Sequence, residues 1–181
     1  MGLESVPLVM EPDALHRARL EAVLAAHGPG LLRVARAYST SPTEAADLAQ
    51  EIAVAIWRAL PSFRGDCSDR TFAYRIAHNR GITHAESRGV RERVTPLVEA
   101  ASPVPDPRPN AEEAMGDQQR REALWLAIGE LPVGARAVLT LALEGMSHEE
   151  IGAVLGTSAN SVAVRLSRAR AELRKRLGRR S

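Results

Sequence analysis

Apolar residues recur at helical spacing along this chain, and no stretch alternates with a period of two for long enough to predict a sheet. The clearest pattern lies between residues 44 and 60, where apolar side chains return every three or four positions. Such a stripe is typical of an amphipathic helix that buries one face. We therefore predict an all-α protein. The stripe consists of Ala45, Leu48, Ala49, Ile52, Ile56 and Leu60.

Glycines and a capping motif divide the first half of the chain into four predicted helices. Gly28 is expected to end the first helix and Gly89 the last, because glycine tolerates the left-handed conformation at a helix end. The motif Ser41-Pro-Thr-Glu44 is a capping box with proline at the first helical position, and it predicts the start of the third helix. The predicted helices span residues 13–27, 29–38, 42–60 and 69–87, with a loop from 61 to 69 before the last one.

The last third of the chain predicts a helix-turn-helix. Ser147 and Glu150 form a second capping box, which starts the first of the two helices. Gly156 lies where that helix must stop, and Ser158 can cap the next one. Small Gly152 allows the two helices to cross closely. The second helix has its apolar positions at Val162, Leu166, Ala169 and Leu173.

Charge is concentrated on that second helix. The whole chain has a net charge of only +2, but residues 161–181 carry 8 basic and 1 acidic side chain, a net charge of +7. A basic end on a nearly neutral protein indicates a local surface that binds a polyanion. Since the helix-turn-helix places its second helix in the major groove, we predict DNA binding here. The residues expected on or near the exposed, DNA-facing side of this helix are Asn160, Ser161, Arg165 and Arg168.

A proline-rich segment separates the two halves. Residues 95–117 contain five of the eleven prolines, which remove amide donors and favour an extended chain. We predict an N-terminal tip (1–12), a helical body (13–92), a linker (93–116) and a second helical body (117–178).

Aromatic side chains cluster before the linker. Five of the six lie within residues 38–74, and we expect Tyr38 and Trp57 to fill the core. Phe63, Phe72 and Tyr74 alternate with arginines, a pattern that single-stranded nucleic acid requires for base stacking and phosphate neutralisation. Core packing is the alternative for these three.

Other classes of function find little support. The chain has no phosphate loop, no nucleophile elbow and no paired zinc ligands, and His148-Glu149-Glu150 does not have the two histidines of a metalloprotease motif. We therefore expect no enzyme activity, no cofactor and no metal. No segment reaches the roughly 18 apolar residues of a membrane span, and the single cysteine excludes an intramolecular disulfide. A cytoplasmic protein is predicted.

Taken together, these segments resemble the extracytoplasmic-function (ECF) class of bacterial RNA polymerase sigma factors, in the sigma-70 family. The resemblance is carried by EAADLAQEIAVAIWRALPSFRG from Glu44, RTFAYRIAHNR from Arg70 and EGMSHEEIGAVLG from Glu144, in this order around the linker. It implies that the first body is region 2 and the second region 4. The implied partners are the clamp and flap of core RNA polymerase, promoter DNA and an anti-sigma factor.

The resemblance also implies roles for individual residues. Asp47, Gln50 and Glu51 match the helix that binds the polymerase clamp, and independently Asp47 and Glu51 lie one turn apart, as an acidic docking face needs. A solvated helix face is the alternative for them. The residues that match the helix for melting and reading the −10 element are Arg70, Phe72, Tyr74, Arg75, Asn79, Arg80 and His84.

The chain departs from the family pattern at several positions. Phe72-Ala73 replaces a usual tryptophan-leucine pair, which puts the strength of strand separation in doubt. Thr83 stands where an acidic residue is common, and Ala163-Val164 replaces a lysine-serine pair, so that a phosphate contact of the recognition helix is in doubt.

Two rival functions remain open at this point. One is a transcription regulator that binds DNA through its helix-turn-helix without engaging polymerase. The other is a helical adaptor or decoy that binds polymerase or an inhibitor without promoter activity.

Overall fold

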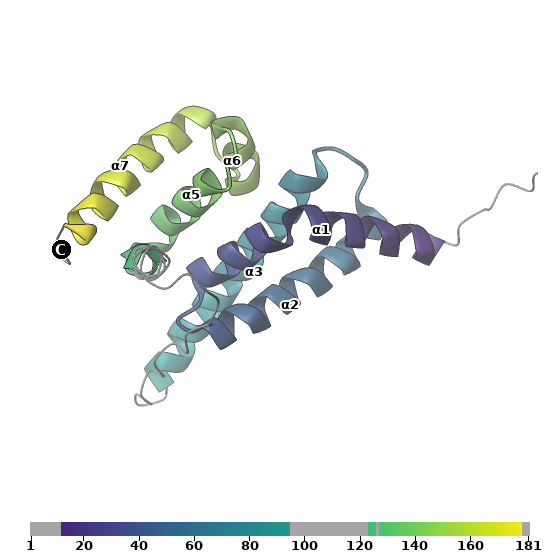
Figure 1. Cartoon of the computed structure of the whole chain (residues 1–181), viewed down its shortest axis with the longest axis horizontal. Helices are drawn as coiled ribbons and strands as arrows, with labels where there is room; N and C mark the ends of the chain where they lie inside the picture. Colours follow the sequence, from purple (N-terminus) through teal and green to yellow (C-terminus); the bar gives the residue numbers. More distant parts are fainter. Residues whose placement is uncertain (1–11, 95–122, 126, 179–181) are drawn as a thin grey trace, which may run out of the picture.

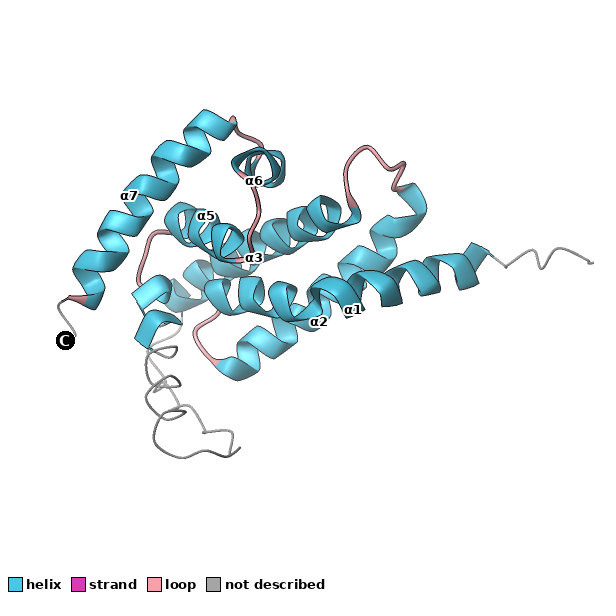
Figure 2. Cartoon of the chain, turned by 45° about the horizontal axis from the view of Figure 1, so that its top comes forward, coloured by secondary structure: helices cyan, strands magenta, loops and turns pink. Residues whose placement is uncertain are grey.

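The described part of the chain is almost entirely helical. The structure, a computed structural model, describes residues 12–94, 123–125 and 127–178. No strand occurs in these ranges, which confirms the predicted all-α fold (Figures 1 and 2). Apart from their edges, the predicted tip (1–12) and linker (93–116) lie outside the described residues. The helices are α1 (Pro12–Tyr38), α2 (Pro42–Ala59), the 3₁₀ helix η1 (Leu60–Ser62), α3 (Asp69–Val94), α5 (Val133–Leu143), α6 (His148–Leu155) and α7 (Ala159–Leu177).

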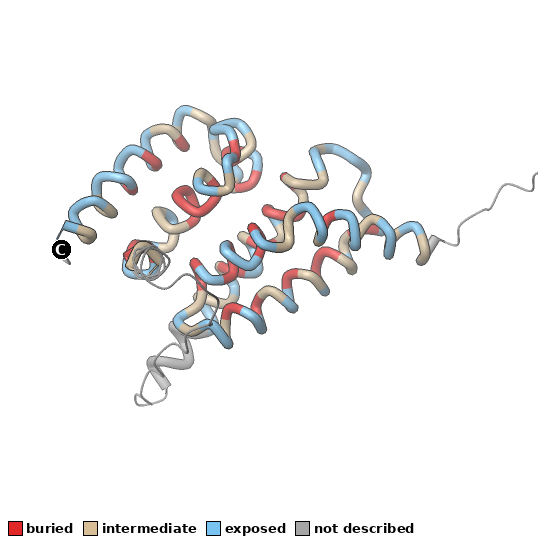
Figure 3. Tube along the Cα trace, viewed as in Figure 1, coloured by how far each residue is buried: buried red, intermediate tan, exposed pale blue. Residues whose placement is uncertain are grey.

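The N-terminal body consists of α1, α2 and α3 around an apolar core (Figure 3). The predicted stripe on α2 is confirmed: Leu48, Ile52 and Ile56 are almost completely buried. Burying each such side chain contributes about 1.5–3 kcal/mol. The stripe therefore fixes the rotation of α2 and turns the opposite face, with Asp47 and Glu51, toward solvent.

Helix α2 starts at the predicted cap. Ser41 is the N-cap, Pro42 occupies the first turn, and the Ser41 hydroxyl accepts a hydrogen bond from the Glu44 amide at 3.1 Å. The Glu44 carboxylate accepts from the amide and hydroxyl of Thr40, at 2.5 and 2.7 Å. Glu44 thus reaches one residue further back than the capping box predicts, and it ties the preceding turn to the helix.

Helix α1 corrects the prediction of two helices that meet at Gly28. It runs unbroken from residue 12 to residue 38 with Pro29 inside it (Figure 1). Proline in a helix interior removes one backbone hydrogen bond and costs about 3 kcal/mol. Val23 lies before this point and Leu31 and Val34 after it, and all three are buried in the same core. Tertiary packing on both sides therefore outweighs the local signal to stop.

Helix α3 is longer than predicted. It continues past Gly89 to Val94, so the predicted end near Gly89 is wrong. One glycine in a helix interior costs only about 1 kcal/mol relative to alanine, which is too little to end a long helix. At its start, the Ser68 hydroxyl accepts a hydrogen bond from the Thr71 amide at 3.1 Å. Ser68 therefore caps α3, a role that was not predicted from the sequence.

The predicted helix-turn-helix is confirmed in detail. Ser147 and Glu150 form the reciprocal capping box of α6, and Gly156 ends that helix in the left-handed conformation with φ 65°. The Ser158 hydroxyl accepts from the Ser161 amide and so caps α7. Along α7 the predicted apolar positions face inward, with Leu173 less deeply buried than the others. Buried residues of α7 are Val162, Leu166 and Ala169.

The two bodies pack against each other. Helix α5 lies on α1, and α6 lies on α3 (Figures 1 and 2). Their buried side chains belong to one continuous cluster. At one edge of this interface, the Arg136 guanidinium donates to the Ala37 carbonyl oxygen at 3.0 Å. The sequence predicts two bodies and a linker but no contact between them, so this packing is a new feature.

Candidate nucleic-acid interface

Helix α7 presents a basic face to solvent. Asn160, Arg165 and Arg168 are exposed, on the side opposite the buried positions. Ser161 is half-buried, and its hydroxyl oxygen accepts a hydrogen bond from the Ser158 hydroxyl at 3.1 Å. The two arginines are therefore free to reach a ligand, whereas Ser161 also takes part in the helix cap.

The basic end of α7 is not uniform. Arg174 and Lys175 are exposed. Arg176 instead donates to Glu172 at 3.0 Å and to Glu130 at 3.3 Å, and it thereby joins the end of α7 to residues that precede α5. Arg176 thus has a structural role that its position in a basic run does not indicate, while its two exposed neighbours contribute positive potential at this end of the helix.

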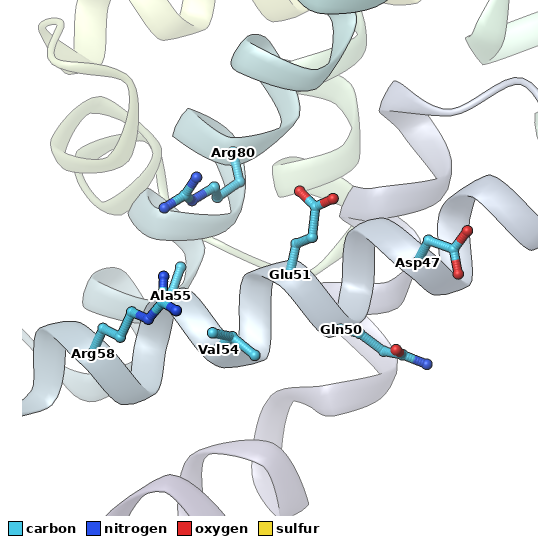
Figure 4. Close-up of a pocket in the computed structure, with 7 residues that line it drawn as sticks. All are labelled: Asp47, Gln50, Glu51, Val54, Ala55, Arg58 and Arg80. Atoms are coloured by element: carbon cyan, nitrogen blue, oxygen red, sulfur yellow. The ribbon is translucent and has the colours of Figure 1, made fainter.

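An acidic face on α2 borders a shallow groove. Asp47, Gln50 and Glu51 are all exposed and lie along one side of the helix, as predicted. Figure 4 shows them with Val54 from the same helix, and Arg80 from α3 at the other side of the groove. Val54 is 47% exposed although it is aliphatic. Acidic groups that share one exposed face can provide charge complementarity to a basic protein partner.

The exposed side of α3 carries polar and basic groups close to this acidic face. Asn79 and Arg80 are exposed, and Arg80 also lines a second groove with His84 and Glu44. His84 is less available, because its Nε2 lies 2.7 Å from the Glu44 carboxylate. One body thus places Arg80 of α3 beside the acidic face of α2.

Two predicted DNA contacts at the start of α3 face the C-terminal body instead of solvent. Tyr74 is only 2% exposed, and its hydroxyl donates to the Glu144 carboxylate at 3.1 Å. Burial, with Glu144 beside it, raises the pKa of Tyr74 to about 12, so the phenol stays neutral. Arg70 donates to the backbone carbonyl of Glu144 and lies 3.9 Å from the Glu150 carboxylate.

Arg75 also contacts the C-terminal body, although it remains exposed. Its Nε donates to the Ala153 carbonyl oxygen of α6 at 3.2 Å.

Glu144 and its partner Arg33 were not predicted as interacting residues, since neither was assigned a role by a motif and 111 positions separate them.

The loop before α3 is held by an aromatic pair. The rings of Phe63 and Phe72 stack with centroids 4.1 Å apart and an interplanar angle of 19°. The Arg19 guanidinium lies 4.7 Å from the centre of the Phe63 ring and donates to Asp69 at 2.6 Å. Arg19 thereby ties the loop to α1 and to the start of α3. It was not among the predicted site residues, because it lies in a separate helix.

The expected core roles of the other aromatics differ in outcome. Tyr38 is buried, and its hydroxyl lies 2.7 Å from Nδ1 of His78. Trp57 is only partly buried. Within the described ranges no group of three His, Cys, Asp or Glu residues is arranged to hold a metal ion. None of the described helices is long and apolar enough to cross a membrane.

Comparison with known proteins identifies both bodies. Residues 23–90 match the family described as Sigma-70 region 2, and residues 121–173 match Sigma-70, region 4. The chain is 32% identical over 157 residues to the RNA polymerase sigma factor CnrH of Cupriavidus metallidurans. This alignment covers 83% of the present chain and 82% of CnrH. It is 33% identical over 131 residues to the ECF RNA polymerase sigma-E factor of Escherichia coli, covering 68% of this chain and 69% of that one.

Solved structures agree with this relationship. CnrH in complex with the cytosolic domain of CnrY superposes with a TM-score of 0.64 at 28% identity, covering 93% of this chain and 98% of that one. The sigma factor RpoE of Bartonella quintana, in complex with the anti-sigma factor NepR, superposes with a TM-score of 0.68 at 22% identity. That alignment covers 90% of this chain and 96% of RpoE, and it shows a shared fold.

Proposed function

Because this chain belongs to the sigma-70 family of RNA polymerase sigma factors, and to its ECF class, we propose that its two bodies bind different promoter elements. The family function is promoter recognition and transcription initiation with core polymerase. We assign polymerase binding and the −10 element to residues 13–92, and the −35 element to residues 117–178. Residues 93–116 link the two.

In this assignment the acidic face of α2 docks on the polymerase clamp through Asp47, Gln50 and Glu51. Their exposure on one side of the helix and the exposed Val54 beside them support it. Charge complementarity at such a surface favours fast and specific association.

Helix α3 and the loop before it bind and open the −10 element. Exposed Asn79 and Arg80 suit contacts to the DNA backbone and to base edges, and the Phe63–Phe72 pair provides an aromatic surface near them in sequence. The residues assigned to this function are Arg70, Phe72, Tyr74, Arg75, Asn79, Arg80 and His84.

Helix α7 reads the −35 element from the major groove. The N-terminal part of a recognition helix normally enters the groove, and the exposed side chains there have the donors that base edges and phosphates require. Asn160, Ser161, Arg165 and Arg168 are assigned to this contact, and Arg168 lies far enough along the helix to reach either a base edge or the DNA backbone.

One observation carries the proposal beyond a simple DNA-binding regulator. The N-terminal body places the acidic face of α2 next to Arg80 of α3, which lines both grooves. A regulator that never meets polymerase has no need for the acidic face. A decoy that binds only polymerase has no need for the exposed arginines of α7.

Run-off transcription with core polymerase and genomic fragments tests the proposal. Specific initiation that depends on this protein is the expected result. DNA binding without initiation would support the regulator instead, and core binding without initiation would support the decoy.

Regulation by an inhibitor follows from the same relationship. CnrH is bound to the cytosolic domain of CnrY and RpoE to the anti-sigma factor NepR in the similar structures. We extend this to an anti-sigma factor that releases the present chain in response to stress or another signal. The chain then acts in the cytoplasm, where its polymerase is.

A further inference from the structure

Glu144 joins the two bodies at a junction formed by Arg33, Arg70, Tyr74 and Glu144. The side chain of Glu144 is only 5% exposed although it lies at the end of α5. Its carboxylate accepts two hydrogen bonds from Arg33, at 2.5 and 2.7 Å, and one from the Tyr74 hydroxyl at 3.1 Å. A buried carboxylate needs such partners, and these come from α1 and α3 of the other body.

Helix α1 leaves space for this junction at Gly30. A Cβ atom on Gly30 would overlap the Tyr74 hydroxyl and an oxygen of Glu144. At Gly28, half a turn away on the same helix, a Cβ would meet nothing within 4 Å. The close approach of Tyr74 and Glu144 to α1 therefore depends on one particular glycine.

The junction uses side chains that are assigned above to promoter DNA. The Tyr74 hydroxyl donates to the Glu144 carboxylate, Arg70 donates to the Glu144 carbonyl, and Arg75 donates to the Ala153 carbonyl. A base or phosphate that took these groups would have to displace α5 and α6. The closed arrangement and −10 binding by Tyr74 and Arg70 therefore exclude each other.

We propose that the Glu144 junction is an intramolecular latch that hides part of the −10 surface until the two bodies separate. The latch itself rests on the contacts between the bodies, and only its inhibitory effect rests on the proposed function of Tyr74 and Arg70. The bond from Arg136 to the Ala37 carbonyl holds a second point of the interface. Weakening the junction is therefore expected to shift the balance from closed toward open chains.

Tyrosine nitration of the full chain measures the opening directly. The chain has two tyrosines, and both are buried: Tyr74 has its hydroxyl against Glu144 of the C-terminal body, and Tyr38 lies in the core of the N-terminal body. Gly30→Ala is expected to raise the nitration rate of Tyr74 about tenfold, as for a chain whose open fraction rises from about a tenth to near one. Tyr38 should stay protected in the same molecules. Gly28→Ala, the matched control, should leave both rates unchanged.

A second variant keeps the test valid if Gly30→Ala perturbs α1. Glu144→Gln removes the charge of the junction, and its control Glu130→Gln removes an equal charge from a pair with Arg176 inside the C-terminal body. Only Glu144→Gln should expose Tyr74. If Tyr74 stays as protected as in the wild type in both junction variants, or is fully reactive in the wild type, the latch is wrong.

Binding of single-stranded oligonucleotide of random sequence, measured by anisotropy, separates the two proposals. A tighter complex in the opened variants supports inhibition by the latch. If Tyr74 becomes reactive but affinity does not change, the inhibitory effect of the latch is refuted while the latch as a contact stands. That outcome would count against the DNA-binding role of Tyr74 and Arg70 even if run-off transcription succeeds.

Discussion

Gly152 of α6 lies directly against Thr157, and a Cβ on Gly152 would be only 2.6 Å from the Thr157 carbonyl oxygen. The obstacle is backbone, which has no rotamer to move away. Gly152→Ala is therefore expected to lower the free energy of unfolding of the C-terminal body by about 1–3 kcal/mol, as overpacking does. Urea denaturation measures it. Gly134→Ala, where a Cβ on α5 meets nothing within 4 Å, should not lower it and can raise it by up to about 1 kcal/mol, since alanine favours the helix over glycine.

Reversing the acidic face of α2 tests polymerase docking. Asp47→Arg combined with Glu51→Arg should weaken core binding by about 1–3 kcal/mol, since like charge replaces complementary charge at the interface. Fluorescence anisotropy with labelled protein provides the affinity. The control is Glu21→Arg combined with Asp66→Arg, two exposed acids of the same body outside this face. Equal loss in both double variants would mean that only net charge matters.

Sequence reading and long-range attraction are separable on α7. Arg165→Ala should cost about 1–3 kcal/mol on a cognate −35 duplex and much less on random duplex. Arg174→Ala combined with Lys175→Ala should weaken both duplexes alike and reduce the salt slope by about one unit for each phosphate that is no longer neutralised. Salt titrations of each variant on both duplexes decide the matter. Equal weakening by Arg165→Ala would make Arg165 a phosphate contact.

Arg176 offers a sharper version of that experiment. Because it is paired with Glu172 and Glu130, Arg176→Gln should change the salt slope less than Arg174→Gln does. It should instead lower the melting temperature, since it disconnects the end of α7. The opposite pattern would show that the acidic pairings give way when DNA is present.

Acid should destabilise the N-terminal body through His78. Burial lowers the pKa of His78, whose Nδ1 accepts a hydrogen bond from the Tyr38 hydroxyl in the neutral form. The unfolded chain therefore takes up the proton first. The free energy of unfolding should fall as the pH drops below about 6.5, the ordinary histidine value, and continue to fall down to the lowered pKa of the folded state.

His78→Gln removes this titration and should flatten the pH dependence in that window. Urea denaturation at a series of pH values compares the two chains. A wild-type slope in the variant would assign the acid sensitivity to other groups.

The parts of the fold that were predictable depend on neighbours in sequence. Ser147 and Glu150 cap α6 across only three positions, and Gly156 ends it because glycine adopts the left-handed conformation. The helix-turn-helix could therefore be predicted from residue types and their spacing. The acidic face of α2 was predictable for the same reason, because the buried stripe determines which side is exposed.

The parts that were missed depend on distant packing. Pro29 does not end α1, because core contacts on both sides of it keep the helix continuous. Tyr74 lies in an arginine-aromatic segment, but whether it faces DNA or the core depends on Glu144, 70 positions away. Arg19 is recognisable as a loop contact only once α1 and the Phe63 loop are side by side.

Arg80 lines both the groove with Asp47 and Glu51 and the groove with His84, so the two sites share an electrostatic potential. A basic partner that covers the acidic pair removes negative potential from Arg80 and strengthens its attraction for phosphate. Linkage then works in both directions: whatever factor polymerase adds to the affinity for DNA, DNA must add to the affinity for polymerase.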